Sequence, residues 1–210
     1  MEIKKEHFTK DLYIKLDKRA TRYNPKSDNK VFDTYPYFMK YRRKLKNTDD
    51  LIVAISIAYS WMPTMLDIYE QTEKTLGKLK AEVIRLRLIT SSKALIKKEK
   101  EVKGILEKLS KATNNSVIGT SKVLHMFYPV HIPIFDSRVI SAWNKLMKKE
   151  AKIPNLNRKN QVSVFYSYWL GILYWREALK HTGVRRIEKK LFDYGGLLKE
   201  RQRKENVQKK

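Results

Sequence analysis

Apolar residues recur every three or four positions through most of the chain, which is the spacing of helices that bury one face. Segments with this spacing cover residues 5–23, 73–89, 93–110 and 184–192. Residues 51–59 and 162–175 are apolar on nearly all sides, which predicts two helices surrounded by the core. No long segment alternates apolar and polar residues as a half-buried strand does. The pattern predicts an all-α fold, with at most a short extended piece at residues 132–135.

The chain is organised around residues 114–147, where two helix starts are predicted. Gly119 can turn the chain at positive φ, and Thr120 or Ser121 can then cap the helix that follows. This arrangement is a hairpin that leads into a helix N-terminus. Backbone N–H groups at such a point face outward without partners, so we expect all three residues to contact a phosphate.

The second helix start lies just after a segment that contains Pro129 and Pro133. These prolines exclude a helix there, and apolar side chains between residues 132 and 135 can anchor the segment in a core. Asp136 then stands at the N-cap position of the next helix, where a carboxylate accepts hydrogen bonds from the first N–H groups. The sequence therefore predicts Asp136 as a helix cap.

The predicted helices form a single unit over residues 1–196, which has enough apolar sequence for one core or for two small lobes that share a cleft. Tyr194 is followed by Gly195 and Gly196, and this pair predicts the end of the last helix. Residues 197–210 then form a basic tail that we expect to fray.

The net charge of the chain indicates which class of molecule it binds. The chain has 46 Lys and Arg residues against 22 Asp and Glu, which gives a formal net charge of +24. Such a field favours a polyanion, so nucleic acid is the leading partner. Arg42, Arg43 and Lys44 form a local basic cluster that predicts a phosphate contact, although a solvated helix face is an equal interpretation. An anionic membrane surface, an acidic protein or adaptation to heat would also account for the charge.

The chain contains no cysteine, which excludes disulfides, thiol catalysis and Cys-type zinc sites. We expect no metal and no cofactor, and an intracellular location fits this composition. The first residues lack the apolar run of a signal peptide. The longest uncharged run, residues 51–66, is short for a membrane span and contains Pro63, so we expect no membrane insertion.

Two segments carry a resemblance to a known family. Residues 119–139, GTSKVLHMFYPVHIPIFDSRV, resemble the signature region of a prokaryotic protein group with the 8-oxoguanine DNA glycosylase fold, within the helix-hairpin-helix DNA glycosylase superfamily. Residues 187–196, IEKKLFDYGG, are similar to a second stretch in those proteins. The resemblance implies an all-helical fold of two lobes, with double-stranded DNA held across the hairpin and a base pocket between the lobes. It also implies recognition of a damaged or modified base, the first step of base excision repair.

Catalytic members of that superfamily combine a lysine after the hairpin with an aspartate at a later helix cap. The resemblance places the aspartate at Asp136 and offers Lys122 for the lysine. A lysine amine attacks the sugar C1′, whereas a carboxylate stabilises the positive charge that develops as the base leaves. Lys122 lies closer in sequence to Asp136 than the family's lysine does, so the resemblance implies base release more strongly than lyase chemistry.

Other roles stay open for each of these residues. Asp136 can be a helix cap only, and Lys122 can be a phosphate contact or a solvated side chain. Arg138 can hold the Asp136 carboxylate or a phosphate. His125 lies on an apolar helix face, where a hydrogen-bonded core role is more typical than catalysis. For the whole protein, the alternatives to a glycosylase are a non-catalytic sensor of modified or foreign nucleic acid and a basic helical scaffold.

Overall fold

The computed structural model describes residues 1–23, 35–40, 45–60, 62, 64–66, 73–180 and 182–208. These residues form helices and connecting loops, and none of them belongs to a strand, so the all-α prediction is confirmed. The α-helices are α1 (Lys10–Ala20), α2 (Tyr35–Lys40), α3 (Thr48–Ser60), α4 (Glu73–Arg85), α5 (Ser92–Lys97), α6 (Glu99–Lys111), α7 (Val117–Phe127), α8 (Ser137–Leu146), α9 (Gln161–Ala178) and α10 (Val184–Gln208). Short 3₁₀ turns are η1 (Lys5–His7), η3 (Leu86–Leu88) and η4 (Lys149–Ala151).

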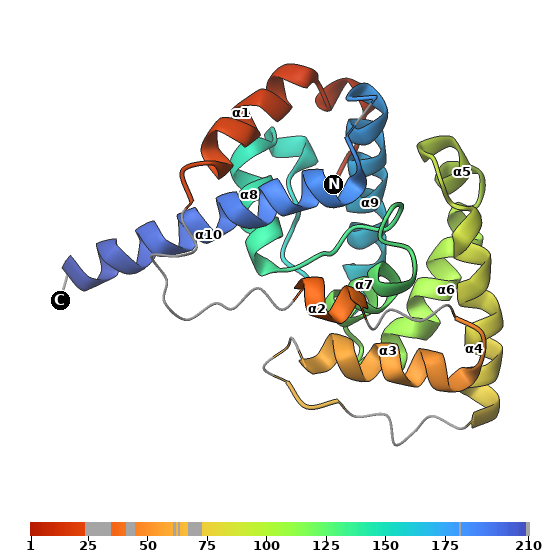
Figure 1. The fold of residues 1–210 in the computed structure, drawn as a ribbon. Coiled ribbons are helices and arrows are strands. Elements are labelled where there is room, and N and C mark those ends of the chain that lie inside the picture. The colour runs from red at the N-terminus through yellow and green to blue at the C-terminus, as the bar shows by residue number, and fades with distance from the viewer. Residues whose placement is uncertain are drawn as a thin grey trace.

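The helices gather in two groups that share α9 (Figure 1). In one group, α10 lies across α8 and α1. In the other, α3 packs on α4 and α7, and α6 packs on α4 and α7. Helix α9 contacts α10 on one side and α5, α6 and α7 on the other. Buried apolar side chains from both groups form one continuous core.

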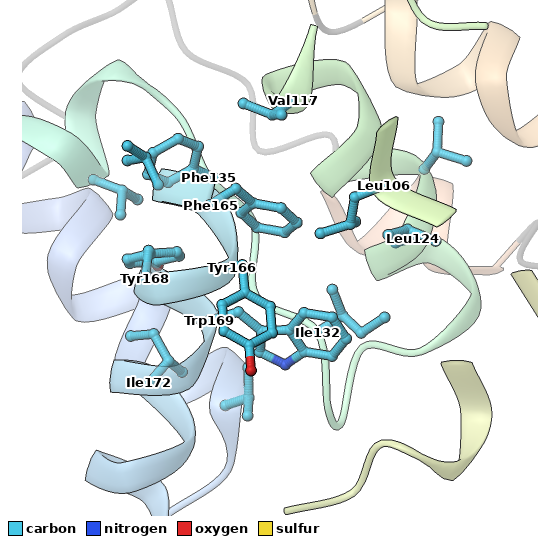
Figure 2. Packing of buried hydrophobic residues seen from close by; sticks show 14 of the residues in the cluster. Leu106, Val117, Leu124, Ile132, Phe135, Phe165, Tyr166, Tyr168, Trp169 and Ile172 are labelled. Atoms are coloured by element: carbon cyan, nitrogen blue, oxygen red, sulfur yellow. The ribbon is translucent and has the colours of Figure 1, made fainter. Parts of the chain in front are cut away.

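Helix α9 supplies the aromatic centre of this core, as its apolar sequence predicts. Phe165, Tyr168 and Trp169 are completely buried, and Figure 2 shows them facing residues of α7 and of the segment that ends at Phe135. The Tyr168 hydroxyl donates to the Ile134 carbonyl at 3.2 Å, and the Trp169 indole donates to the His131 carbonyl at 2.7 Å. These bonds anchor the segment that leads to Asp136, because they satisfy its carbonyls inside the core.

The Gly195–Gly196 pair does not end the last helix. Helix α10 continues through both glycines to Gln208. A side-chain carbon at Gly195 would overlap the Arg138 carbonyl, and one at Gly196 would lie 2.7 Å from the Tyr23 ring. The two glycines therefore let α10 pack closely against Arg138 and Tyr23. The predicted helix end at residues 194–196 is wrong. Residues 201–207 lie exposed on the last turns of this helix.

Candidate functional site

Asp136 is the N-cap of α8, as predicted. One carboxylate oxygen accepts hydrogen bonds from the backbone N–H groups of Arg138 and Val139, both at 2.9 Å. The residue has extended backbone geometry and stays partly exposed. A carboxylate in this position is stabilised by the helix dipole as well as by the two N–H groups.

Helix α7 begins earlier than predicted, so Gly119 is neither a turn nor a residue just before the helix. Ser116 is the N-cap, and its hydroxyl accepts a hydrogen bond from the Gly119 N–H at 3.2 Å. The left-handed backbone positions before this helix are Asn114 and Asn115, each with φ of 52°, and none of the described glycines has positive φ. Gly119 is instead a packing residue, because an added side-chain carbon would lie 3.0 Å from the Tyr59 hydroxyl oxygen of α3.

Thr120 and Ser121 lie inside the protein rather than at its surface. Both side chains are completely buried. The Thr120 N–H donates to the Ser116 carbonyl at 3.0 Å, and the Thr120 hydroxyl donates to the same carbonyl at 2.9 Å. The predicted capping by Thr120 or Ser121 is therefore wrong. The N–H groups of residues 119 and 120, proposed as phosphate contacts, are engaged within the fold.

Ser121 has a different role, which brings the two predicted catalytic residues together. Its hydroxyl accepts a hydrogen bond from the Phe135 N–H at 3.0 Å and lies 2.8 Å from the Ile118 carbonyl oxygen. Ser121 precedes Lys122, and Phe135 precedes Asp136, so this bond joins the two chain segments at the candidate site. The Ser121 side chain thus fixes the position of Asp136 relative to α7.

Lys122 is a buried lysine beside that carboxylate. It is 8% exposed. Burial lowers the pKa of the Lys122 amine, because the charged form loses water, and the Asp136 charge acts in the opposite direction. The predicted Lys122 and Asp136 are therefore close enough to interact, and burial has the larger effect on the amine.

Two residues of α10, Arg185 and Glu188, add charged groups to this site. Glu188 is 1% exposed and forms an ion pair with Arg185, one helical turn earlier. The pKa of Glu188 is raised to about 7, because the effect of burial outweighs that of Arg185, which lowers the pKa, and the Asp136 charge adds a smaller increase. The sequence carries a signal for Glu188, because it falls on the apolar stripe of Val184 and Leu191 at helical spacing.

Tyr35 joins α10 to α7 next to this ion pair. The Arg185 guanidinium lies over the Tyr35 ring, 3.7 Å from its centroid. The Tyr35 hydroxyl lies 2.8 Å from His125 Nε2, and His125 Nδ1 lies 2.6 Å from the Ile132 carbonyl oxygen. His125 is buried, which confirms its predicted place as a hydrogen-bonded core residue. We call Lys122, Asp136, Glu188, Arg185, Tyr35 and His125 the polar cluster.

Arg138 and Lys199 lie at the same end of α8. The Arg138 guanidinium lies over the Phe192 ring of α10, 4.8 Å from the centroid, so its backbone N–H rather than its side chain binds Asp136. The Lys199 amine donates to the Ser137 hydroxyl at 2.9 Å. Lys199 thus places a basic side chain of α10 at the start of α8. Arg42, Arg43 and Lys44 lie outside the described residues.

The comparisons with known proteins give no relative. No family model, curated protein or solved structure matches the chain. The family resemblance therefore rests on residues 119–139 and 187–196. Within the residues that the structure covers, no three His, Asp or Glu side chains are grouped as metal ligands, and no helix has the length and apolarity to cross a membrane.

Proposed function

We propose that the protein binds DNA and recognises a damaged or modified base, whose N-glycosidic bond it cleaves with Asp136 and Lys122. The observation that carries this proposal is the approach of the two residues, from the middle of α7 and the start of α8, within the polar cluster. The resemblance to the helix-hairpin-helix DNA glycosylases points to the same two residues. The all-helical fold in two groups around α9 is consistent with it.

The two residues have distinct roles in this reaction. As the bond between the sugar C1′ and the base nitrogen breaks, the electron pair leaves with the base and positive charge develops on the sugar. The Asp136 carboxylate opposes that charge. Burial makes the neutral form of the Lys122 amine more accessible at neutral pH, and the neutral amine can form a new bond to C1′. Water takes that place if the amine does not reach C1′.

Charge supports DNA as the partner. A net charge of +24 attracts a polyanion, and Lys199 places one of these charges at the start of α8, next to Asp136. Arg201 and Arg203 follow on the exposed turns of α10. We expect DNA affinity to fall steeply as salt rises, because each neutralised phosphate releases counterions. Fluorescence anisotropy with a labelled duplex measures this, and affinity independent of salt would contradict the proposal.

A non-catalytic sensor of modified or foreign nucleic acid is the second candidate. The burial of Lys122 favours it, because a side chain 8% exposed offers little surface to a sugar. In this function the cluster holds the fold together, and Asp136 is only a helix cap. The two candidates share DNA binding and differ in chemistry.

A screen of duplexes that carry different modified bases distinguishes them. We expect base release from at least one duplex, and borohydride trapping of a covalent complex if Lys122 is the nucleophile. Base release without trapping would assign the attack to water. DNA binding without release from any duplex would favour the non-catalytic sensor.

A further inference from the structure

Glu188 has no part in the proposed reaction, yet it is among the most deeply buried charged residues of the described chain. Burial opposes its ionisation more strongly than Arg185 favours it, since the pKa of Glu188 rises to about 7 despite the ion pair. An apolar residue of similar size at this position would avoid that cost. A carboxylate kept in the core beside a candidate site therefore points to a role in that site.

The contacts of Arg185 indicate what that role is. Its guanidinium is shared between Glu188 on its own helix and the ring of Tyr35 on α2. Tyr35 in turn reaches His125 on α7, one helical turn after Lys122. Three helices that are distant in sequence therefore meet through one chain of polar contacts, from Glu188 through Arg185 and Tyr35 to His125.

We propose that Glu188 is a positioning residue of the site: ionised and paired with Arg185, it holds Tyr35 against His125 and so keeps α2 in place beside Lys122. This inference rests on the proposed function in taking Lys122 and Asp136 as the reacting pair. We call the four residues from Glu188 to His125 the clasp. Because Tyr35 contacts His125 one helical turn after Lys122, a closed clasp should limit the access of small molecules to the Lys122 amine.

The groups around Glu188 set the pH at which the clasp opens. Arg185 and Lys189 face it from its own helix, Asp136 from the start of α8, and the buried Tyr168 from α9. Because the pKa of Glu188 is raised to about 7, its carboxylate is mostly ionised above that pH and mostly protonated below it. Protonation removes the ion pair, so the clasp should be closed in mildly basic solution and loosened in mildly acidic solution.

The test is the rate at which formaldehyde and cyanoborohydride methylate Lys122, read by peptide mass spectrometry in the absence of DNA. Glu188→Gln removes the charge and keeps the shape. We expect Lys122 to react several-fold faster in this variant than in the parent at pH 8.5. The ratio of the two rates should fall towards one at pH 5.5, because the parent Glu188 is then protonated as well. Glu188→Asp should restore part of the protection.

Asp193→Asn is the matched control, because Asp193 also forms an ion pair on α10, with Lys189, outside the clasp. This variant should methylate Lys122 at the parent rate at both pH values. Tyr35→Phe breaks the clasp at its other end, so it should also raise the rate at pH 8.5. The double variant should react no faster than the faster single variant, since both changes open the same contact.

An equal Lys122 rate in the parent and in Glu188→Gln at pH 8.5, or a ratio that does not change with pH, would overturn the inference. If Glu188→Gln does not fold, Tyr35→Phe and Arg185→Lys decide: slow, parent-like methylation in both would refute the clasp. The measurement needs no glycosylase substrate. A closed clasp in a protein that releases no base would therefore count against the proposed function alone.

Discussion

Helices α7 and α8 both contribute to the candidate site, and their starts show how differently two helix N-termini can be used. At α8, Asp136 caps the helix with a charged side chain that remains partly exposed. At α7, Ser116 caps the helix with a neutral hydroxyl, and the next residues are buried against α3 and α6. Both caps accept N–H hydrogen bonds, but of the two caps only Asp136 is a charged side chain near solvent. We therefore propose that the chemistry takes place at the α8 start.

The largest expected effect follows from the Asp136 charge. Asp136→Asn should reduce base release by about a hundredfold or more, because an amide caps the helix but does not oppose positive charge on the sugar. Folding and salt-dependent DNA binding should change little. Single-turnover base release, thermal unfolding and anisotropy measure the three properties.

Ser116→Ala is the matched control at the α7 start. Loss of the Ser116 cap should cost about 1 kcal/mol of stability and leave base release near the parent rate. Equal loss of activity in the two variants would mean that Asp136 acts only as a cap. Full activity of Asp136→Asn would mean that the family resemblance does not carry over to this residue.

A second variant tests the glycine contact between α8 and α10. Gly195→Ala should destabilise the protein by about 3 kcal/mol or more, because the added carbon would overlap the Arg138 carbonyl and separate the two helices. Gly104→Ala on α6 is the control, since no atom of the described part of the chain lies within 4 Å of its added carbon. This change should stabilise by about 0.5–1 kcal/mol, the usual gain of alanine over glycine in a helix. Chemical denaturation compares the two.

Glu188 of α10 is affected by the Asp136 charge at the α8 start, and its raised pKa predicts that the free energy of unfolding depends on pH. The folded-state pKa of Glu188 is about 7 against an ordinary value of 4.5, so the folded protein binds this proton more tightly than the unfolded chain. Its contribution is complete below pH 4.5 and is lost as pH rises through about 7, a change on the order of 3 kcal/mol. Glu188→Gln should lack this decline, and thermal unfolding from pH 5 to pH 8.5 tests the difference. An identical decline in both proteins would rule out a raised pKa at Glu188.

The sequence predicts an element correctly where local chemistry allows only one backbone structure. Pro133 excludes a helix and Asp136 is the first cap after it, so the α8 start was predictable. Prediction fails at glycines, because a glycine in sequence does not reveal whether it serves a turn or a close contact. Gly119 and Gly195 both serve contacts here, with Tyr59 and the Arg138 backbone. Glu188 was missed for a related reason: its role depends on Arg185, Tyr35 and Asp136, which fold together from three separate regions.

The last and smallest effect distinguishes the two roles of Gly119. Gly119→Ala places a carbon 3.0 Å from the Tyr59 hydroxyl oxygen, so the contact between α3 and α7 must widen, at a cost of about 1 kcal/mol. The Tyr59 hydroxyl is buried and has no hydrogen-bond partner among the described residues, so Tyr59→Phe alone should be nearly neutral or slightly stabilising. In the double variant the hydroxyl is absent while the ring carbon at 3.2 Å remains, so part of the Gly119→Ala cost should disappear. A glycine needed for a turn at positive φ would give the same cost with either residue at position 59, so additive effects in denaturant unfolding would contradict the packing role.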